Sequence, residues 1–599
     1  MRRFIVRVAV FAGLALLLGP VRTVAADVPL EPFGTFGFAG TEFAVGLDPQ
    51  NPYGGKPSLR IAAQTASSAV FGASHWDFDA TPYRGKRIRC DAAVKTAAVE
   101  TNASVWMRID GPTKMAFDNM MPGRGLTGTR DWTPLAVVLD VPNDATKILC
   151  GGLLVTLHGA MWLAAPHLDV VPPSVAVTGG ATDVAQKPKD EAPPPPHVLD
   201  AAHRADALRG LRSAAAPLAT VDAAAPDRDL GAFDRAVGNA RIVGLGEGTH
   251  GTSEFFALKH RLFRELVEKK GFTVFAIEGN QPEARVMEAY VTAGAGDPAA
   301  ALKAMYFWTW QTQEVVALAN WMRAYNAAPG KHATLHFAGF DMQTATVAET
   351  AVITFATQHD AAAGNAIAAA YVCLPKGVAA PEAGTLAARQ ACAASVAKAA
   401  PILAKLRPDL ETAHDARIVE QFAGMTVAAN AGAARDAAMA ENVGWLADTK
   451  YPHAKIALWA HNYHIADETH GGMRTMGAWL HERRGAAYYR LGFAFDRGSV
   501  RAMQRNGLLG VQEVAAALPD SLEGLFRNAG DRYFVDLDTL PGGTLRTWLD
   551  GGTLLRSVGA LYDASTPKAF YEVEHVRQAF DGLIFVAETH AAQAIVPVK

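Results

Sequence analysis

Residues 246–251, Gly-Glu-Gly-Thr-His-Gly, place a carboxylate and an imidazole close together just after the apolar run 241–245. A histidine with a pKa near neutrality can take a proton from water. A carboxylate that accepts the other ring N–H fixes the tautomer and stabilises the imidazolium. Glu247 and His250 are therefore candidates for the partner and the general base of a hydrolysis in which water attacks directly.

The same six residues also match G-x-G-x-x-G, the fingerprint of a dinucleotide-binding turn, and Glu278 is available as the acid that would bind a ribose hydroxyl. Glu247 opposes this interpretation, because a carboxylate between the first two glycines would face a pyrophosphate. The interpretation also gives His461 and His464 no role. We therefore favour hydrolysis.

Three further strand-like runs also end in acids or histidines. They cover residues 272–277, 333–338 and 455–460, and they are followed by Glu278, by Asp341, and by His461 and His464. Parallel strands bring their carboxyl ends to one edge of a sheet, where ligands bind. We therefore expect these side chains to share a site with Glu247 and His250.

The elements that must position this site lie in residues 198–599. Apolar strand-like runs alternate there with helical stretches, which is typical of an α/β fold with a largely parallel sheet and helices on both faces. Further strands are expected at 488–495, 533–537 and 583–586. The Ala-rich segment of about 346–450 is far longer than a simple crossover, and we expect it to be a helical insertion.

The preceding region is of another kind. Residues 28–171 contain short alternating runs, which predict an all-β sandwich that resembles the jelly-roll modules that bind carbohydrate. Its Trp106, Trp132 and Trp162 would belong either to the core or to a sugar-binding surface. Residues 172–197 are rich in proline and predict an extended linker.

The first 26 residues have the pattern of a signal peptide, with early arginines, an apolar run too short to span a bilayer, and a cleavage site near Ala26. We expect an exported protein, periplasmic or secreted, that is not an integral membrane protein. In an oxidising compartment the four cysteines can pair, and the simplest pairing joins Cys90 to Cys150 and Cys373 to Cys392. The net charge of −3 and the absence of basic runs beyond the N-terminus disfavour nucleic acid as a partner.

The chain contains no G-x-S-x-G, no G-x-x-x-x-G-K-[ST] and no H-E-x-x-H motif. Carboxylates and histidines without an activated serine or cysteine suit attack by water, either with no cofactor or with Zn²⁺ or Mn²⁺ bound by the same residues. Both schemes predict hydrolysis. A third hypothesis is an exported, non-catalytic protein that binds a glycan or haem.

Six segments together resemble the erythromycin esterase family: GEGTHGTSEFF at 246–256, IEGN at 277–280, EVVALANWMRAYN at 314–326, GFDMQ at 339–343, RDAAMAENV at 435–443 and WAHNYHI at 459–465. The resemblance implies hydrolysis of a carboxylic ester, such as a macrolide lactone, by a histidine-activated water without metal. It implies that His250 is the base and Glu247 its partner. Glu278 matches the second acid of the family motif, and His461 and His464 fall on its H-N-x-H segment.

Six residues are candidates for contacts with a small-molecule ester substrate. Lys259 stands where the family can have an arginine, and Arg474 is an alternative cation. Trp308 and Trp310 would line a pocket or belong to the core, and Asn462 and Asp341 would bind substrate or anchor their own loops. We expect Arg435 to be a buried ion-pair partner rather than a catalytic group.

Overall fold

The computed structural model describes residues 26–37, 43–64, 71–111, 114–120, 123–156, 158–183, 197–330, 332–375, 386–470, 473–504 and 509–595. The predicted signal peptide, apart from Ala26, and the proline run of the predicted linker lie outside these ranges. None of the helices in them combines the length and the apolar character that a bilayer crossing needs.

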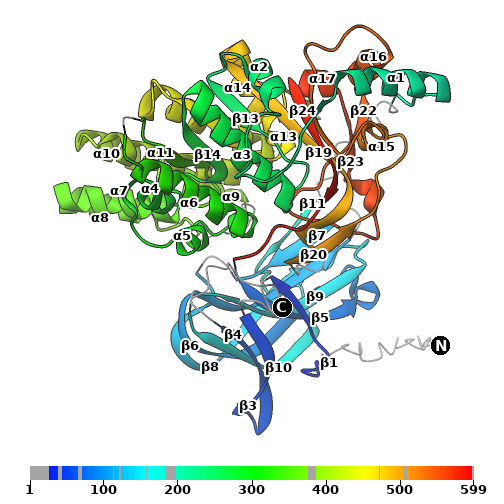
Figure 1. Cartoon of the computed structure of the whole chain (residues 1–599). Coiled ribbons are helices and arrows are strands. Elements are labelled where there is room, and N and C mark those ends of the chain that lie inside the picture. The colour runs from blue at the N-terminus through cyan, green and yellow to red at the C-terminus, as the bar shows by residue number, and fades with distance from the viewer. Residues whose placement is uncertain are drawn as a thin grey trace, which may run out of the picture.

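The N-terminal domain is antiparallel β structure, seen in blue and cyan in Figure 1. Its described strands are β1 (Ala26–Asp27), β2 (Gly34–Gly37), β3 (Phe43–Tyr53), β4 (Lys56–Ala63), β5 (Gly72–Asp79), β6 (Arg87–Asp110), β7 (Lys114–Asp118), β8 (Leu126–Asp140), β9 (Lys147–Val155), β10 (Ala160–Val171) and β11 (Gly180–Asp183).

These strands form one 11-stranded sheet instead of the two separate sheets that a sandwich implies. The reason is β6, whose 24 residues pair with β8 and β10 along its first half and with β7 and β9 along its second. The sheet encloses a core that contains Val105, Met107 and Ile109, which alternate along β6 and so lie on one face of it. β11 extends the domain into residues that we expected to belong to the linker, because it pairs with β7.

The C-terminal domain is built on a nine-stranded sheet among the described residues. Its strands are β12 (Ala216–Pro217), β13 (Ile242–Leu245), β14 (Phe272–Asn280), β15 (His336–Asp341), β16 (Lys455–Trp459), β19 (Tyr488–Met503), β20 (Leu509–Val514), β21 (Arg532–Asp536) and β24 (Gly582–Thr589). Neighbours are parallel from β15 through β14, β16, β13 and β19 to β24, whereas β12, β20 and β21 pair antiparallel. The sheet is thus mixed, where we expected a largely parallel one.

Helices cover both faces of this sheet, because its central strands are apolar on both sides. One face packs on α2 (Gly231–Val237), α3 (Ser253–Lys270), α4 (Arg285–Ala293), α5 (Pro298–Ala304) and α6 (Gln313–Ala327). The other packs on α1 (Ala201–Ala214), α12 (Ala431–Trp445), α14 (Met476–Arg484), α15 (Leu522–Phe526), α16 (Thr544–Asp550) and α17 (Val576–Ala579). Two small hairpins, β17 (Thr469–His470) with β18 (Met473–Arg474) and β22 (Thr553–Arg556) with β23 (Tyr571–Glu574), complete the domain.

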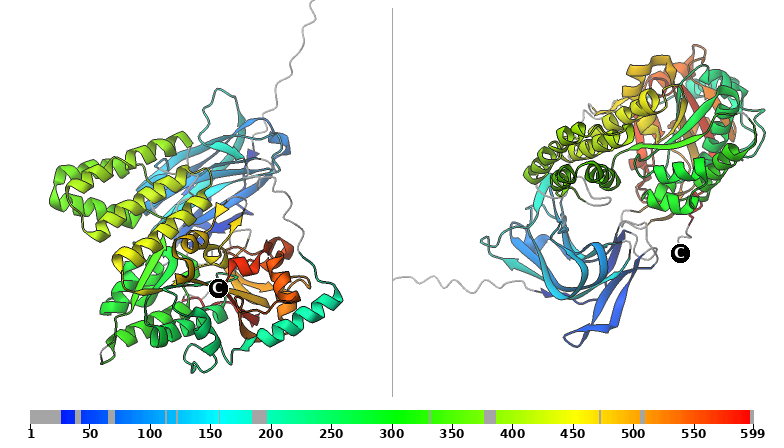
Figure 2. Two further views of the ribbon diagram at one scale, coloured as in Figure 1. Left: turned by 90° about the horizontal axis from the view of Figure 1, so that it is seen from above. Right: turned by 90° about the vertical axis from the view of Figure 1, so that its left-hand side faces the viewer.

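Between β15 and β16 the chain forms the predicted run of helices: α7 (Thr346–His359), α8 (Ala361–Tyr371), α9 (Leu386–Val396), α10 (Ala399–Lys405) and α11 (Leu410–Val427), followed by α12. Most of them pack around a hydrophobic core of their own. They project to one side of the domain, away from β19 and β24 (Figures 1 and 2). Disulfides join Cys373 to Cys392 within this insertion and Cys90 to Cys150 in the β domain, which confirms the simplest pairing.

Candidate active site

The loop after β13 holds Glu247 at the base of the site. Its carboxylate is fully buried and accepts three hydrogen bonds, from Nδ1 of His250 at 2.7 Å, from Nζ of Lys259 at 2.5 Å and from Nε1 of Trp459 at 2.6 Å. Burial raises the pKa of Glu247, but the Lys259 charge and the His250 contact outweigh it and hold that pKa below its usual value. Glu247 is therefore an ionised partner for His250.

The glycines around Glu247 serve close packing within the protein. A Cβ on Gly246 would meet Oδ1 of Asn462 at 2.3 Å, and one on Gly251 would meet the carbonyl oxygen of Arg501 at 1.9 Å. In a dinucleotide site the second glycine, here Gly248, is the one whose backbone approaches the pyrophosphate. A Cβ on Gly248 would meet the carbonyl oxygen of Phe493 at 3.0 Å, so this glycine also lies against the protein's own backbone, which fits the choice made against a nucleotide turn.

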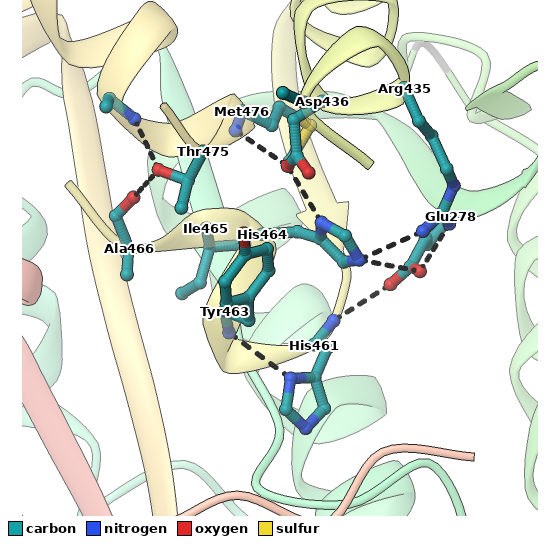
Figure 3. Close-up of polar contacts among 12 residues, drawn as sticks. Glu278, Arg435, Asp436, His461, Tyr463, His464, Ile465, Ala466, Thr475 and Met476 are labelled. Atoms are coloured by element: carbon teal, nitrogen blue, oxygen red, sulfur yellow. Dashed lines mark hydrogen bonds and ion pairs between the residues drawn. The ribbon is translucent and has the colours of Figure 1, made fainter. Parts of the chain in front are cut away.

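A second cluster forms around Glu278, which follows the apolar run of β14 and lies within the last residues of that strand. Its carboxylate accepts from Nη2 of Arg435 at 2.7 Å and from the backbone N–H of His461 at 3.0 Å, and it lies 3.3 Å from Nε2 of His464 (Figure 3). Burial opposes ionisation of Glu278, but the charges of His464 and Arg435 hold its pKa well below the usual value. Both carboxylate oxygens thus face protein donors.

His464 lies between two acids. Its Nδ1 is 2.8 Å from Oδ1 of Asp436, and its Nε2 faces Glu278 and Arg435. Burial lowers its pKa, yet the charges of Glu278 and Asp436 prevail and raise the pKa of His464 to about 10. This ring is accordingly an imidazolium held inside the cluster.

Arg435 and Asp436 both lie on α12. The structure confirms that Arg435 is an ion-pair partner, of Asp341 at 2.6 Å and of Glu278 at 2.7 Å. Sequence reasoning missed that both of these acids are residues of the predicted site, and it missed Asp436 as the partner of His464. The motif RDAAMAENV carried the available signal, because it places an arginine and an acid together on a helix that packs against the sheet.

His461 connects the two clusters. Its backbone N–H binds Glu278, and Figure 3 shows its ring pointing away from that carboxylate. The ring lies 5.0 Å from the ring of His250, centroid to centroid. Its Nδ1 accepts the backbone N–H of Tyr463 at 3.2 Å, and among the described residues its buried Nε2 has no hydrogen-bond partner. Burial, aided by the His250 charge, lowers the pKa of His461 to about 3, so this ring is neutral at working pH.

The six expected substrate contacts lie elsewhere or are buried. Lys259 and Asp341 are completely buried against Glu247 and Arg435, and Asn462 donates to and accepts from the backbone of Phe493. Arg474 pairs with Glu482 at 2.6 Å and stacks on Trp479 outside both clusters. The polar groups of these four residues already bind protein partners, so these positions favour structural roles.

The two tryptophans are also part of the protein interior. Trp310 is 1% exposed and donates its Nε1 to the carbonyl oxygen of Glu278, and its ring lies 6.4 Å from that of His250. Trp308 is 7% exposed and packs against Arg501. Trp310 therefore packs beside the His250 ring in the protein interior, which is closer to the core alternative than to the pocket alternative.

A divalent metal ion would need several imidazole, thiolate or carboxylate groups that converge and that are not already paired with other cations. No group of three or more His, Cys, Asp or Glu side chains within the described ranges is arranged to hold a metal. Glu247 already faces Lys259, and Glu278 already faces Arg435 and the His464 imidazolium. Because these cations occupy the carboxylates, the residues present do not fit a divalent metal.

Residues 267–589, more than half of the chain, match the family model described as erythromycin esterase. The chain belongs to the erythromycin esterase family. This membership, together with the acid–histidine clusters, supports a hydrolase.

Curated proteins and solved structures are also similar to parts of this chain. Erythromycin esterase type II of Escherichia coli is 32% identical over 116 residues, which are 19% of this chain and 26% of that protein. The chain spans less than half the length of two curated relatives. It covers 26% of this enzyme and 47% of YbfP of Bacillus subtilis strain 168. A crystal structure of a Bacillus cereus protein shares the fold, with a TM-score of 0.59 at 24% identity over 65% of this chain and 98% of that one.

Proposed function

We propose that this member of the erythromycin esterase family hydrolyses carboxylic esters by direct attack of a water molecule that His250 activates. The observation that carries the proposal is the arrangement of His250. A carboxylate can only accept, so the His250 nitrogen that faces Glu247 carries the hydrogen, and Nε2 of the neutral ring is left with its lone pair. Nε2 is therefore the atom available to take a proton.

His461 would supply the complementary group. Its Nδ1 accepts a backbone N–H, so the hydrogen of the neutral ring sits on Nε2. A buried N–H donor next to the base is what a carbonyl needs when it becomes tetrahedral and its oxygen becomes negative. Because its pKa is about 3, His461 serves as a fixed donor and does not compete with His250 for the proton.

In the proposed reaction a water molecule adds to the ester carbonyl and the alcohol then leaves. The oxygen of water forms a bond to the ester carbonyl carbon while Nε2 of His250 takes the proton, and the oxyanion accepts from Nε2–H of His461. When the tetrahedral intermediate collapses, the bond to the alkoxy oxygen breaks and the His250 imidazolium returns the proton to that oxygen. Glu247 stabilises the imidazolium between the two steps.

A macrolide lactone is the first ester to test, because a relative is named an erythromycin esterase. The test is hydrolysis of a panel of macrolide lactones, simple alkyl esters and amides, followed by mass spectrometry. Ring opening or ester cleavage supports the proposal. Failure across the whole ester panel by folded protein refutes it and leaves the non-catalytic binding alternative.

We propose carbohydrate binding as a second function, located in the β domain. An open groove of about 560 Å³ is lined by Asp48, Asn51, Arg60 and Trp162, among other residues of β3, β4 and β10. Asp48 accepts from Nε1 of Trp162 at 2.6 Å and from Asn51 at 3.0 Å, so planar polar groups and an aromatic edge share one surface, which suits a polyhydroxyl ligand. Trp106 is 6% exposed and Trp162 is 8% exposed, but only Trp162 lines the groove, and Trp106 belongs to a separate cluster. Binding of plant and bacterial polysaccharides that Asp48→Ala abolishes would support this function, and retention on no polysaccharide would refute it.

A further inference from the structure

The guanidinium of Arg435 connects the ends of three strands. It binds Asp341 at the end of β15 through Nε at 3.1 Å and Nη2 at 2.6 Å, and it binds Glu278 of β14 through the same Nη2 at 2.7 Å. Its Nη1 also lies 3.1 Å from Nε2 of the His464 imidazolium, in the short helix α13 (Asn462–Ile465) after β16. Both of these atoms carry hydrogens, so Arg435 and His464 are joined through the Glu278 carboxylate that both of them face. A planar, permanently charged fork can serve several acceptors in fixed directions, which an ammonium cannot.

Glu278 links Arg435 to His461. One carboxylate oxygen is held by Arg435, and the other accepts the backbone N–H of His461. His461 is also the residue that caps α13, so its backbone position sets where the ring begins. A shift of the Glu278 carboxylate would consequently move the imidazole that faces His250.

We infer that Arg435 is a positioning residue for the proposed hydrolysis: by holding Glu278 and Asp341, it fixes the His461 ring beside His250. The inference rests on the proposed function for its kinetic part. It also gives the helical insertion a role, because α12 is the insertion's last helix and carries both Arg435 and Asp436.

The effect of removing Arg435 follows from the charges around Glu278. The described groups that face it are Arg435 on α12, His464 and His461 on α13, and, at longer range, His250 on the loop after β13. Burial lowers the pKa of Lys259 on α3, and the charge of Glu278 acts on that pKa in the opposite direction. Without the guanidinium, burial opposes the charge of Glu278 with less compensation, and the pKa of Glu278 rises. Glu278 would then begin to take up a proton at a higher pH than in the wild type, its hold on His461 would weaken, and the acid limb of the rate profile would move to higher pH.

The test compares Arg435→Met and Arg435→Lys with Arg285→Met. Arg285 is a matched control, because it forms a comparable pair with the buried Asp415 of the insertion, at 2.8 Å, and its acid partners, Asp415 and Glu411, belong to neither cluster. For Arg435→Met we expect kcat to fall about 10- to 100-fold, as misplacement of a catalytic group by about 1 Å would produce, with KM changed less than about threefold. We expect the acid limb to move up, Arg435→Lys to recover part of kcat, and Arg285→Met to keep both kcat and the acid limb.

Two results would overturn the inference: a fall in kcat for Arg435→Met no larger than that for Arg285→Met, or an unchanged acid limb. Spectra of ¹⁵N-labelled histidine rings in wild type and Arg435→Met provide a readout that needs no substrate. Shifted resonances of His461 and His464 support the positioning role even if the wild type hydrolyses nothing, in which case only the proposed function fails. Unchanged resonances refute the positioning role whatever the activity.

Discussion

The rings of His250 and His461 lie 5.0 Å apart, and hydrogen bonds on their far sides give them opposite characters. Glu247 leaves His250 with a lone pair on Nε2, whereas the backbone N–H of Tyr463 leaves His461 with a hydrogen on Nε2. In the proposed mechanism these two identical side chains therefore serve as a base and as a hydrogen-bond donor.

Replacement of His461 by alanine should remove the oxyanion donor. We expect kcat on the best ester to fall about 10²–10³-fold, with a small change in KM, because the donor acts on charge that develops only in the transition state. His453→Ala is the control, because His453 is exposed and lies just before β16, the strand that His461 follows. Equal kinetics for the two variants would argue against an oxyanion role for His461.

Lys259 should define the alkaline limb of the rate profile. Burial lowers its pKa to about 8, although Glu247 opposes this shift. As the pH rises through 8, Lys259 loses its proton, Glu247 loses its buried cation, and activity should decline. Lys259→Arg keeps the charge at high pH and should move the limb upward, whereas Lys269→Met, at the partly exposed end of α3, should leave the limb in place. If Lys259→Arg leaves the alkaline limb where it is in the wild type, another group is responsible for that limb.

Removal of metal should not affect the reaction, because the acids of the site already pair with cations. The protein is dialysed against a chelator, and elemental analysis of the dialysed protein checks that metal has been removed. We expect its rate of hydrolysis to stay within about a factor of two of the rate before dialysis. Loss of activity that Zn²⁺ or Mn²⁺ restores would instead establish the metal-dependent alternative.

The Cys373–Cys392 bridge should stabilise the insertion. It joins residues 19 apart, a loop for which chain entropy predicts a contribution of about 3 kcal/mol. The double serine variant should lower the unfolding transition of the C-terminal domain, as measured by calorimetry. The Cys90–Cys150 double variant should affect the β domain and leave kcat unchanged. If the Cys373–Cys392 variant melts like wild type, the bridge contributes nothing to stability.

Much of this site could be predicted from strand ends alone. Acids and histidines that follow Leu245, Ile277 and Trp459 had to meet, because those strands are parallel neighbours in the sheet. The antiparallel edge at β20 and β21 could not be predicted, since a buried strand has the same apolar pattern in either direction.

The hydrogen-bond partners of these side chains could not be predicted from the sequence. The strand ends predict that Glu278 and His464 lie near His250, but only the structure shows that their polar atoms face Arg435 and Asp436. Arg435 reaches Glu278 from a helix 157 residues further along the chain, and no local pattern records a contact of that separation. Lys259 is a similar case, since its helix position alone does not show that it is buried under Glu247.

The most direct measurement is kcat/KM of His250→Ala on an ester that the wild type hydrolyses, with folding checked by calorimetry. The proposed mechanism predicts a loss of about 10²–10⁴-fold, the usual contribution of a positioned general base, in a protein whose melting temperature is close to that of the wild type. A folded His250→Ala variant that retains kcat/KM within a few-fold of wild type would contradict activation of water by His250.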